Sequence, residues 1–191
     1  EYANGNGYNP DTDECNLPDT NYEIKYEGIT DTLIIPYQVE IDGEMYKITE
    51  VDLSIEGRND DLEHGAQTLP SIENIIYPNT VKMISEHDYI WNYDSNTFKL
   101  KNIVLSENLT KIPKRFFRNV KSLEKIKIPH NVKTIGTGAF DKCKSLTTIE
   151  IPSSVTNIED GAFSGCEALT TINLPASITT IKNDTFSNCY A

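Results

Sequence analysis

The sequence has 191 residues, of which 38% are hydrophobic, and it carries 29 acidic against 17 basic side chains for a net charge of −12. A chain of this length can bury a core and form one or two domains. The acidic balance makes nucleic acid and anionic membranes poor partners, because binding to phosphates needs an excess of Lys and Arg at the contact. No apolar run approaches the roughly 20 residues of a membrane-spanning helix, so none is predicted.

Residues 1–21 are rich in Asn, Asp, Gly and Thr, a composition that predicts a flexible N-terminal tether or, as the alternative, an extension of the N-terminal cap. The first ten residues, EYANGNGYNP, contain neither an initiator Met nor a charged segment followed by an apolar one. We therefore expect any targeting signal to precede this sequence. Cys15 stands apart in the tether and is assigned no role.

Residues 22–53 predict a first, degenerate repeat with an N-terminal β-hairpin cap. The motif LIIP at 33–36 is followed by two alternating segments around Asp42-Gly43, a dipeptide favoured in two-residue hairpin turns. Residues 54–68, SIEGRNDDLEHGAQT, are polar and acidic and predict an insertion loop. The clusters NPDTDE and RNDDLE lack the spacing of acids in a calcium-binding loop, so no metal site is predicted.

Residues 69–191 are built from repeats, which predict a solenoid. Four units of 23 residues begin at Leu100, Leu123, Leu146 and Leu169. An upstream unit, which contains LPSIENIIYPNTVKMI, keeps the same offsets. It is 28 residues long, and its additional residues lie in WNYDSN. The apolar positions shared by the four regular units are Ile103, Ile126, Ile149 and Ile172; Leu105, Ile128, Ile151 and Leu174; Leu109, Val132, Val155 and Ile178; Ile112, Ile135, Ile158 and Ile181; and Phe117, Phe140, Phe163 and Phe186.

Each unit predicts one rung of a coil. The alternation in TTIEIP is that of a strand with one buried face, and the Pro that follows ends the strand because it lacks an N–H. VTNI predicts a second short extended piece, and GAFSGCEAL a single helical or 3₁₀ turn. One rung cannot bury enough apolar surface to fold alone, so about six rungs stack with strands about 4.8 Å apart. The predicted fold class is therefore an α/β repeat solenoid.

Three cysteines recur at one position of successive units: Cys143, Cys166 and Cys189. We interpret them as small apolar core residues, because zinc sites use closely spaced Cys-x₂₋₄-Cys pairs and none is present. Neighbouring rungs bring such residues within disulfide range, so a single bridge stays open as an alternative.

The sequence offers little for catalysis. His64, His87 and His130 are scattered over an insertion, a bulge and a turn, and no Ser or Cys recurs with a His and a carboxylate in matching contexts. We predict that the protein is not an enzyme and needs no cofactor.

The repeat pattern L-x-x-I-x-I-P-x-x-V-x-x-I-x-x-x-A-F-x-x-C, present at 123–143 and 146–166, resembles the BspA-like leucine-rich repeats of bacterial and some protist surface proteins. The resemblance implies a right-handed leucine-rich-repeat solenoid that is secreted or anchored at the cell surface and binds host matrix proteins or other cells. The departures from the pattern are Ser106 in place of Pro, Phe116 in place of Ala, Val120 in place of Cys, and Asp184-Thr185 in place of Gly-Ala.

Outward side chains of the predicted strands form a broad, shallow surface that suits a protein or an extended glycan better than a small metabolite. Taken one at a time, the threonines are equally explained as good strand formers on a solvated sheet. The two rows are Lys125, Thr148 and Thr171, and Val104, Lys127, Glu150 and Asn173.

The unit at 100–122 is basic and predicts a second surface on the outer side of the coil, where the helical turn is expected. Its charged residues are Lys101, Lys111, Lys114, Arg115, Arg118 and Lys121, against the single acid Glu107. This patch either binds an anionic partner, such as a sulfated glycan or an acidic protein, or complements the acidic N-terminal half, which carries 21 acids against 5 bases over residues 1–99. We prefer the complementing role.

Tyr89, Trp91 and Tyr93 form an aromatic bulge beside the basic unit. Exposed aromatic side chains dominate many protein interfaces and stack on sugars, although these three could equally pack the bulge against the core. The hypothesis that follows is a cell-surface adhesion or protein-interaction module. The alternative is a carbohydrate-binding component of a surface glycan-uptake system.

Overall fold

The computed structural model describes residues 31–41, 43–51, 72–84 and 99–191, together with four two-residue strands near the N-terminus. Those strands are β1 (Tyr2–Ala3), β2 (Tyr8–Asn9), β3 (Glu14–Cys15) and β4 (Tyr22–Glu23). β1 pairs antiparallel with β4, and β2 with β3. The rest of the predicted tether, the insertion at 54–68 and the segment WNYDSN lie outside the described residues.

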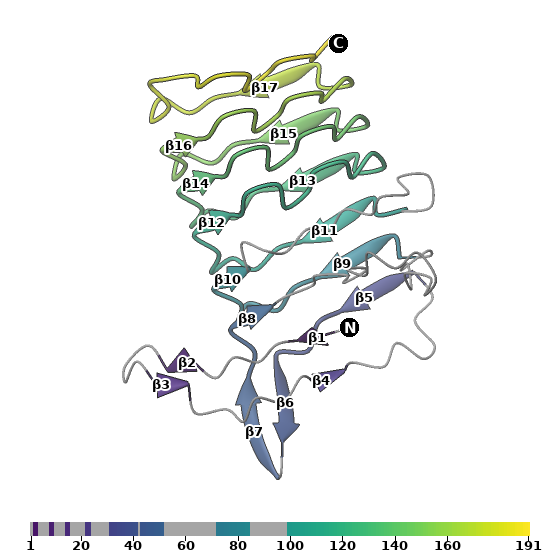
Figure 1. Ribbon diagram of the computed structural model, residues 1–191, viewed down its shortest axis with the longest axis vertical. Helices are drawn as coiled ribbons and strands as arrows, with labels where there is room; N and C mark the ends of the chain where they lie inside the picture. Colours follow the sequence, from purple (N-terminus) through teal and green to yellow (C-terminus); the bar gives the residue numbers. More distant parts are fainter. Residues whose placement is uncertain are drawn as a thin grey trace, which may run out of the picture.

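The repeats form stacked rungs, each one full turn of a coil (Figure 1). One strand of each rung lies in a main row, in which parallel neighbours pair in register. The strands of this row are β5 (Thr32–Ile34), β9 (Asn74–Ile76), β11 (Asn102–Val104), β13 (Lys125–Lys127), β15 (Thr148–Glu150) and β17 (Thr171–Asn173). The predicted parallel stacking of strands is therefore confirmed.

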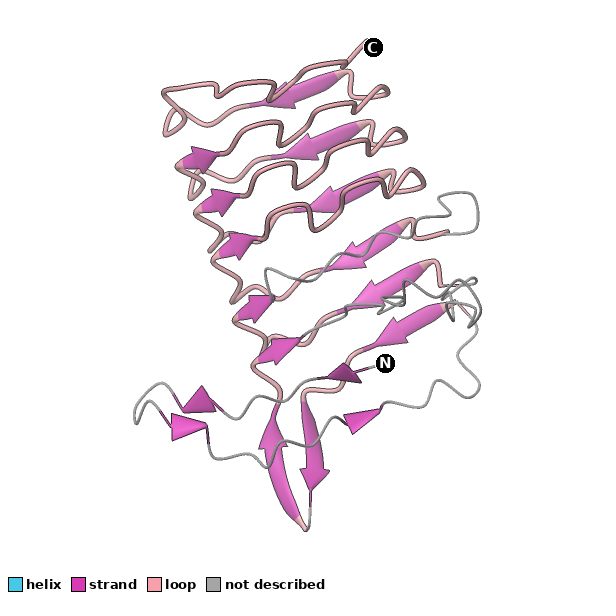
Figure 2. Cartoon of the chain, in the orientation of Figure 1, coloured by secondary structure: helices cyan, strands magenta, loops and turns pink. Residues whose placement is uncertain are grey.

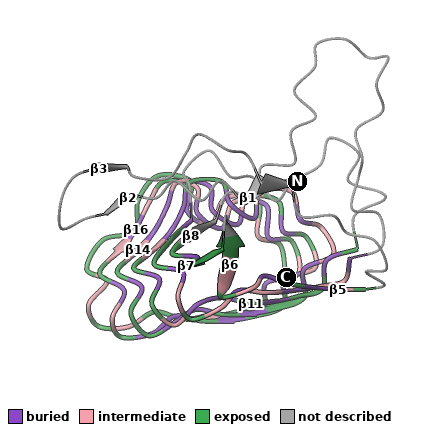
Figure 3. Cartoon of the chain, turned by 90° about the horizontal axis from the view of Figure 1, so that it is seen from below, coloured by how far each residue is buried: buried purple, intermediate pink, exposed green. Residues whose placement is uncertain are grey.

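A second row of shorter strands follows the Pro or Ser that ends each main strand. It consists of β8 (Glu50–Val51), β10 (Met83–Ile84), β12 (Lys111–Ile112), β14 (Thr134–Ile135) and β16 (Asn157–Ile158). Neighbouring strands in this row are also parallel where they pair. The predicted apolar columns are buried in the rungs of residues 100–168, whereas Leu174 and Ile181 of the last rung are exposed. Seen along the long axis, the rungs lie over one another as successive turns of one coil (Figure 3).

Both rows are interrupted at the rung of residues 100–122. The main row divides into two three-stranded sheets, β5-β9-β11 and β13-β15-β17, and the second row divides into β8-β10 and β12-β14-β16. The rung of residues 100–122 is thus paired to the preceding rung through β11 and to the following rung through β12. Among the four 23-residue units, it is also the one that departs most from the repeat pattern.

The turns correct one prediction, because the described residues contain no helix (Figure 2). In the rung of 123–145 the N–H groups of Ala139, Asp141 and Cys143 donate to carbonyl oxygens three residues earlier, as in β-turns. The alternate N–H groups, those of Gly138, Phe140 and Lys142, donate to the next rung at 2.7–3.0 Å. A 3₁₀-helix would direct every N–H within its own turn. The predicted helical turn and the α/β class are therefore not confirmed, and the described repeats form parallel sheets.

The hairpin predicted at Asp42-Gly43 is present. β6 (Gln38–Ile41) pairs antiparallel with β7 (Glu44–Lys47), and Gly43 has a φ of 85° at the turn. The hairpin projects from the first rung along the axis of the stack (Figure 1). All four side chains of β7 are exposed, whereas Val39 packs against the core.

Candidate functional site

The outer face of the main row is a regular surface that the repeats create. The first and third residues of each three-residue strand point outward while the second is buried, as in β11, β13 and β15. The register brings the predicted polar residues together in two rows: Lys125, Thr148 and Thr171, and Lys127, Glu150 and Asn173. All six are exposed.

The polar rows end, toward the N-terminus, at an ion pair that spans the interruption of the main row. Lys127 Nζ lies 2.9 Å from Glu107 Oε1, and the backbone N–H of His130 donates to Glu107 Oε2 at 3.4 Å. The hydrogen bond from Lys127 is the main reason that the pKa of Glu107 is lowered from its ordinary value of 4.5. Because both side chains of this ion pair are substantially exposed, it contributes little to stability.

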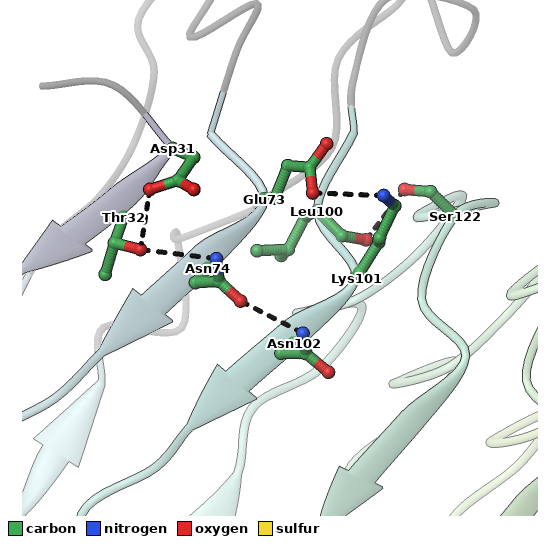
Figure 4. A network of polar contacts seen from close by, with 8 residues as sticks. All are labelled: Asp31, Thr32, Glu73, Asn74, Leu100, Lys101, Asn102 and Ser122. Carbon is green, nitrogen blue, oxygen red and sulfur yellow. Dashed lines mark hydrogen bonds and ion pairs between the residues drawn. The ribbon is translucent and has the colours of Figure 1, made fainter.

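The N-terminal half of the same face carries a ladder of hydrogen-bonded polar side chains (Figure 4). Asn102 Nδ2 donates to Asn74 Oδ1 at 3.0 Å, and Asn74 Nδ2 donates to Thr32 Oγ1 at 3.2 Å. Thr32 Oγ1 in turn donates to Asp31 Oδ1 at 3.0 Å. The ladder crosses β5, β9 and β11, so each amide is held in a fixed orientation by the strand beside it.

An exposed aliphatic row runs beside this ladder, two residues further along each strand. It consists of Ile34, Ile76 and Val104, which the register aligns. Ile34 is 64% exposed and Val104 55%, whereas Ile76 between them is half-buried. Sequence reasoning included Val104 but missed the two isoleucines. They could have been found by aligning the irregular upstream units on their strands, which places Ile76 28 residues before Val104 and Ile34 a further 42 residues before Ile76.

The basic residues of the rung at 100–122 are divided among several environments. Lys101 pairs with Glu73 of the preceding rung at 3.0 Å, as expected if the patch complements the acidic half (Figure 4). Arg118 instead pairs with Asp141 of the following rung, at 3.0 Å between Nε and Oδ2. Lys114 and Arg115 are exposed, and neither takes part in the ion pairs of the described residues.

The remaining predicted site residues, Tyr89, Trp91 and Tyr93, lie outside the described residues, as do His64 and His87. His130 is described and is exposed. Within the part of the chain that the structure describes, no three His, Cys, Asp or Glu side chains are grouped as a metal site would need.

The recurrent cysteines lie in the core column for which they were predicted. Cys143 and Cys166 are buried and Cys189 is half-buried, and all three are free thiols. Burial raises the pKa of Cys166 to about 12 and that of Cys143 well above its ordinary value of 9.0. Because the thiolate is the nucleophile and the metal ligand, burial disfavours the reactive form of Cys143 and Cys166.

Comparison with known proteins gives a consistent assignment. The family model described as "BspA type Leucine rich repeat region (6 copies)" matches residues 62–191. A leucine-rich repeat protein of Bacteroides ovatus is 27% identical, with a TM-score of 0.65 over 88% of this chain and 43% of its own. The leucine-rich repeat protein of T. pallidum is 27% identical, with a TM-score of 0.66 over 84% of this chain and 66% of its own.

The chain thus spans less than two thirds of the length of both solved relatives. No match is found among the curated proteins. In the described residues, no helix has the length and the apolar character needed to cross a membrane.

Proposed function

The chain belongs to the BspA-type leucine-rich repeat family, and from this premise we propose that it is a non-enzymatic protein, secreted or held at the cell surface, that mediates adhesion by binding a protein partner. An extracellular-matrix protein or a protein on another cell is the partner that such a role implies.

The observation that carries the proposal is the amphipathic face of the sheet β5-β9-β11. Protein interfaces combine an apolar centre with a polar rim. The exposed side chains of Ile34 and Val104 supply an apolar centre. The ladder formed by Asn74 and Asn102 supplies a polar rim, and its amides are already ordered before any partner binds. Pre-ordered side chains lose less conformational entropy on association, which favours affinity.

The polar rows of β13, β15 and β17 extend this surface beyond the aliphatic row. Lys125 and Lys127 follow Asn102 of the ladder and Val104 of the aliphatic row by one repeat of 23 residues. The register aligns Thr148 and Thr171 with Lys125, and Glu150 and Asn173 with Lys127. In the stack, β13 follows β11 (Figure 1). A partner that lies along the axis would therefore contact apolar side chains at one end and charged or hydroxyl-bearing side chains at the other.

Carbohydrate binding as part of a glycan-uptake system is the alternative. It depends on Tyr89, Trp91 and Tyr93, because aromatic rings stack on sugars. The row exposed on β5, β9 and β11 is aliphatic instead of aromatic, and this favours a protein partner.

The test is binding of the whole chain to a panel of purified matrix proteins and neutral polysaccharides, measured by biolayer interferometry. The double variant Ile34→Glu/Val104→Glu is expected to bind its matrix protein about tenfold or more weakly, since it places two unpaired carboxylates in the apolar centre and a tenfold loss needs only about 1.4 kcal/mol. Met83→Glu is the matched control, because Met83 is 54% exposed but lies in β10 of the second row.

Two results would overturn the proposal. One is binding to a neutral polysaccharide with no binding to any matrix protein. The other is an equal loss of affinity in the Met83→Glu control and in the double variant.

A further inference from the structure

The turns contain two columns of residues with left-handed backbone conformation, repeated every 23 residues. The first column is Arg115, Gly138, Gly161 and Asp184, with φ between 54° and 61°, and the second is Asn119, Lys142, Gly165 and Asn188, with φ between 60° and 69°. Glycine adopts this conformation freely, and Asn and Asp tolerate it better than other residues do. Arg115 and Lys142 are the two members for which neither explanation holds.

These two exceptions share three properties. Both are basic, both are exposed, and they lie on consecutive rungs. In each case the side chain lies over a glycine of the next rung. Arg115 Cγ is 3.6 Å from the position that a Cβ atom would occupy on Gly138, and Lys142 Cγ is 3.2 Å from the position that a Cβ atom would occupy on Gly165. The glycines thus leave room for the two aliphatic stems, whose charged ends reach the solvent.

Further charge surrounds these two residues. Lys114 is adjacent in sequence to Arg115 and is exposed, and Arg118 is paired with Asp141, whose Cβ also lies 3.6 Å from the Cβ position of Gly138. The ion pairs of the described residues include none of Lys114, Arg115 and Lys142. The cluster formed by Lys114, Arg115, Arg118, Asp141 and Lys142 therefore has four cations and one carboxylate.

Strained backbone that the fold does not require is a reason to look for a function, because the repeat itself shows that glycine serves at both positions. We propose that this cluster is a binding site for a linear sulfated polysaccharide, in which Arg115 and Lys142 contact sulfate groups. The guanidinium of Arg115 presents paired N–H donors to an oxyanion, and the ammonium of Lys142 acts as a point charge.

The surroundings distinguish this ligand from other polyanions. Among the described residues, no large apolar side chain is exposed between 111 and 144, whereas a protein interface needs an apolar centre. Single-stranded nucleic acid binds through aromatic stacking as well as charge, and the aromatic rings of this segment, Phe116, Phe117 and Phe140, are fully buried. A sulfated polysaccharide can bind through its charges alone.

This site lies on the turns and not on the strands, so it goes beyond the proposed protein-binding function and can be tested apart from it. The probe is heparin, with affinity measured by calorimetry on the whole chain at physiological ionic strength. The double variant Arg115→Gly/Lys142→Gly gives both positions the glycine that their own columns contain elsewhere. Its affinity for heparin is expected to fall roughly tenfold, while its melting temperature stays within about 2 °C of the parent protein.

The matched control is Asp184→Gly/Asn188→Gly, which makes the same backbone change in the same two columns without removing a cation. Heparin affinity is expected to stay unchanged or to rise slightly. The proposal is overturned if the Arg115→Gly/Lys142→Gly variant keeps its affinity for heparin. If that variant also melts several degrees lower than the parent protein, both side chains are assigned to stability. Binding of poly-glutamate or single-stranded DNA as tight as that of heparin would overturn the choice of ligand. Loss of matrix-protein binding in the sheet variants leaves these outcomes unaffected.

Discussion

The thiol of Cys166 donates a hydrogen bond to the carbonyl oxygen of Phe140, which is 26 residues earlier, at an S···O distance of 3.2 Å. The same bond joins Cys143 to Phe117 at 3.1 Å and Cys189 to Phe163 at 3.3 Å. The cysteines are therefore more than small apolar residues, because each also links its rung to the preceding one through a polar contact inside the core.

Replacement of Cys166 by alanine is expected to lower the free energy of unfolding by about 1–2 kcal/mol, through the lost thiol bond and a small cavity. The loss stays modest because the Phe140 carbonyl also accepts the N–H of Cys143 at 3.1 Å. Denaturant titration measures the change. Cys189→Ala is the comparison and should cost less, since Cys189 is only half-buried. Equal losses in the two variants would contradict the role assigned to burial.

The raised thiol pKa values predict a loss of stability in alkaline solution. Burial raises the pKa of Cys166 from its ordinary value of 9.0 to about 12, so the folded protein holds this proton more tightly than the unfolded chain does. The resulting stability is complete below pH 9 and decreases as the pH rises from 9 toward 12. Melting temperatures of the parent protein and of Cys166→Ala should therefore converge over this range. A constant difference between the two proteins would show that Cys166 does not titrate in this way.

Replacement of Phe116 by alanine is expected to lower the free energy of unfolding strongly, although the repeat pattern has alanine at this position. The following rungs have Ala139 and Ala162 at this position, so Phe116→Ala restores the pattern. Phe116 is nevertheless fully buried, and its ring packs edge-on against Phe117 with centroids 4.6 Å apart. We expect a loss of about 3–5 kcal/mol in the free energy of unfolding, because a large cavity remains.

The control for this change is Thr185→Ala in the last rung, which also restores the pattern residue. Thr185 is buried and its hydroxyl donates locally to the carbonyl of Lys182 at 2.8 Å, so the expected loss is that of one hydrogen bond, about 0.5–1.5 kcal/mol. Similar effects of Phe116→Ala and Thr185→Ala in denaturant titrations would disprove the cavity argument.

The candidate surfaces were predicted in part. The register alone placed Thr148 beside Thr171 and Glu150 beside Asn173, because a fixed 23-residue offset puts equivalent residues on neighbouring strands. The 23-residue offset did not reveal that Ile34 and Ile76 continue the row of Val104, because the upstream units have other lengths. The same offset aligns Arg115 with Gly138 and Gly161, but only the structure shows that all three have a left-handed φ.

The sequence by itself determined the rung length, the buried columns and the hairpin. These features follow from burial, which requires apolar side chains at fixed intervals and so leaves a periodic pattern. Only the tertiary structure determined which acceptor each hydrogen-bond donor bonds to. The N–H of Phe140 donates to Ala162 of the next rung while the N–H of Cys143 stays within its own, and this alternation replaces the expected helical turn. The positions of the breaks in the two strand rows and the thiol bond from Cys166 to Phe140 were decided in the same way. Hydrogen-bond partners depend on the distance and orientation of the neighbouring rung, which the order of residues along one rung does not contain.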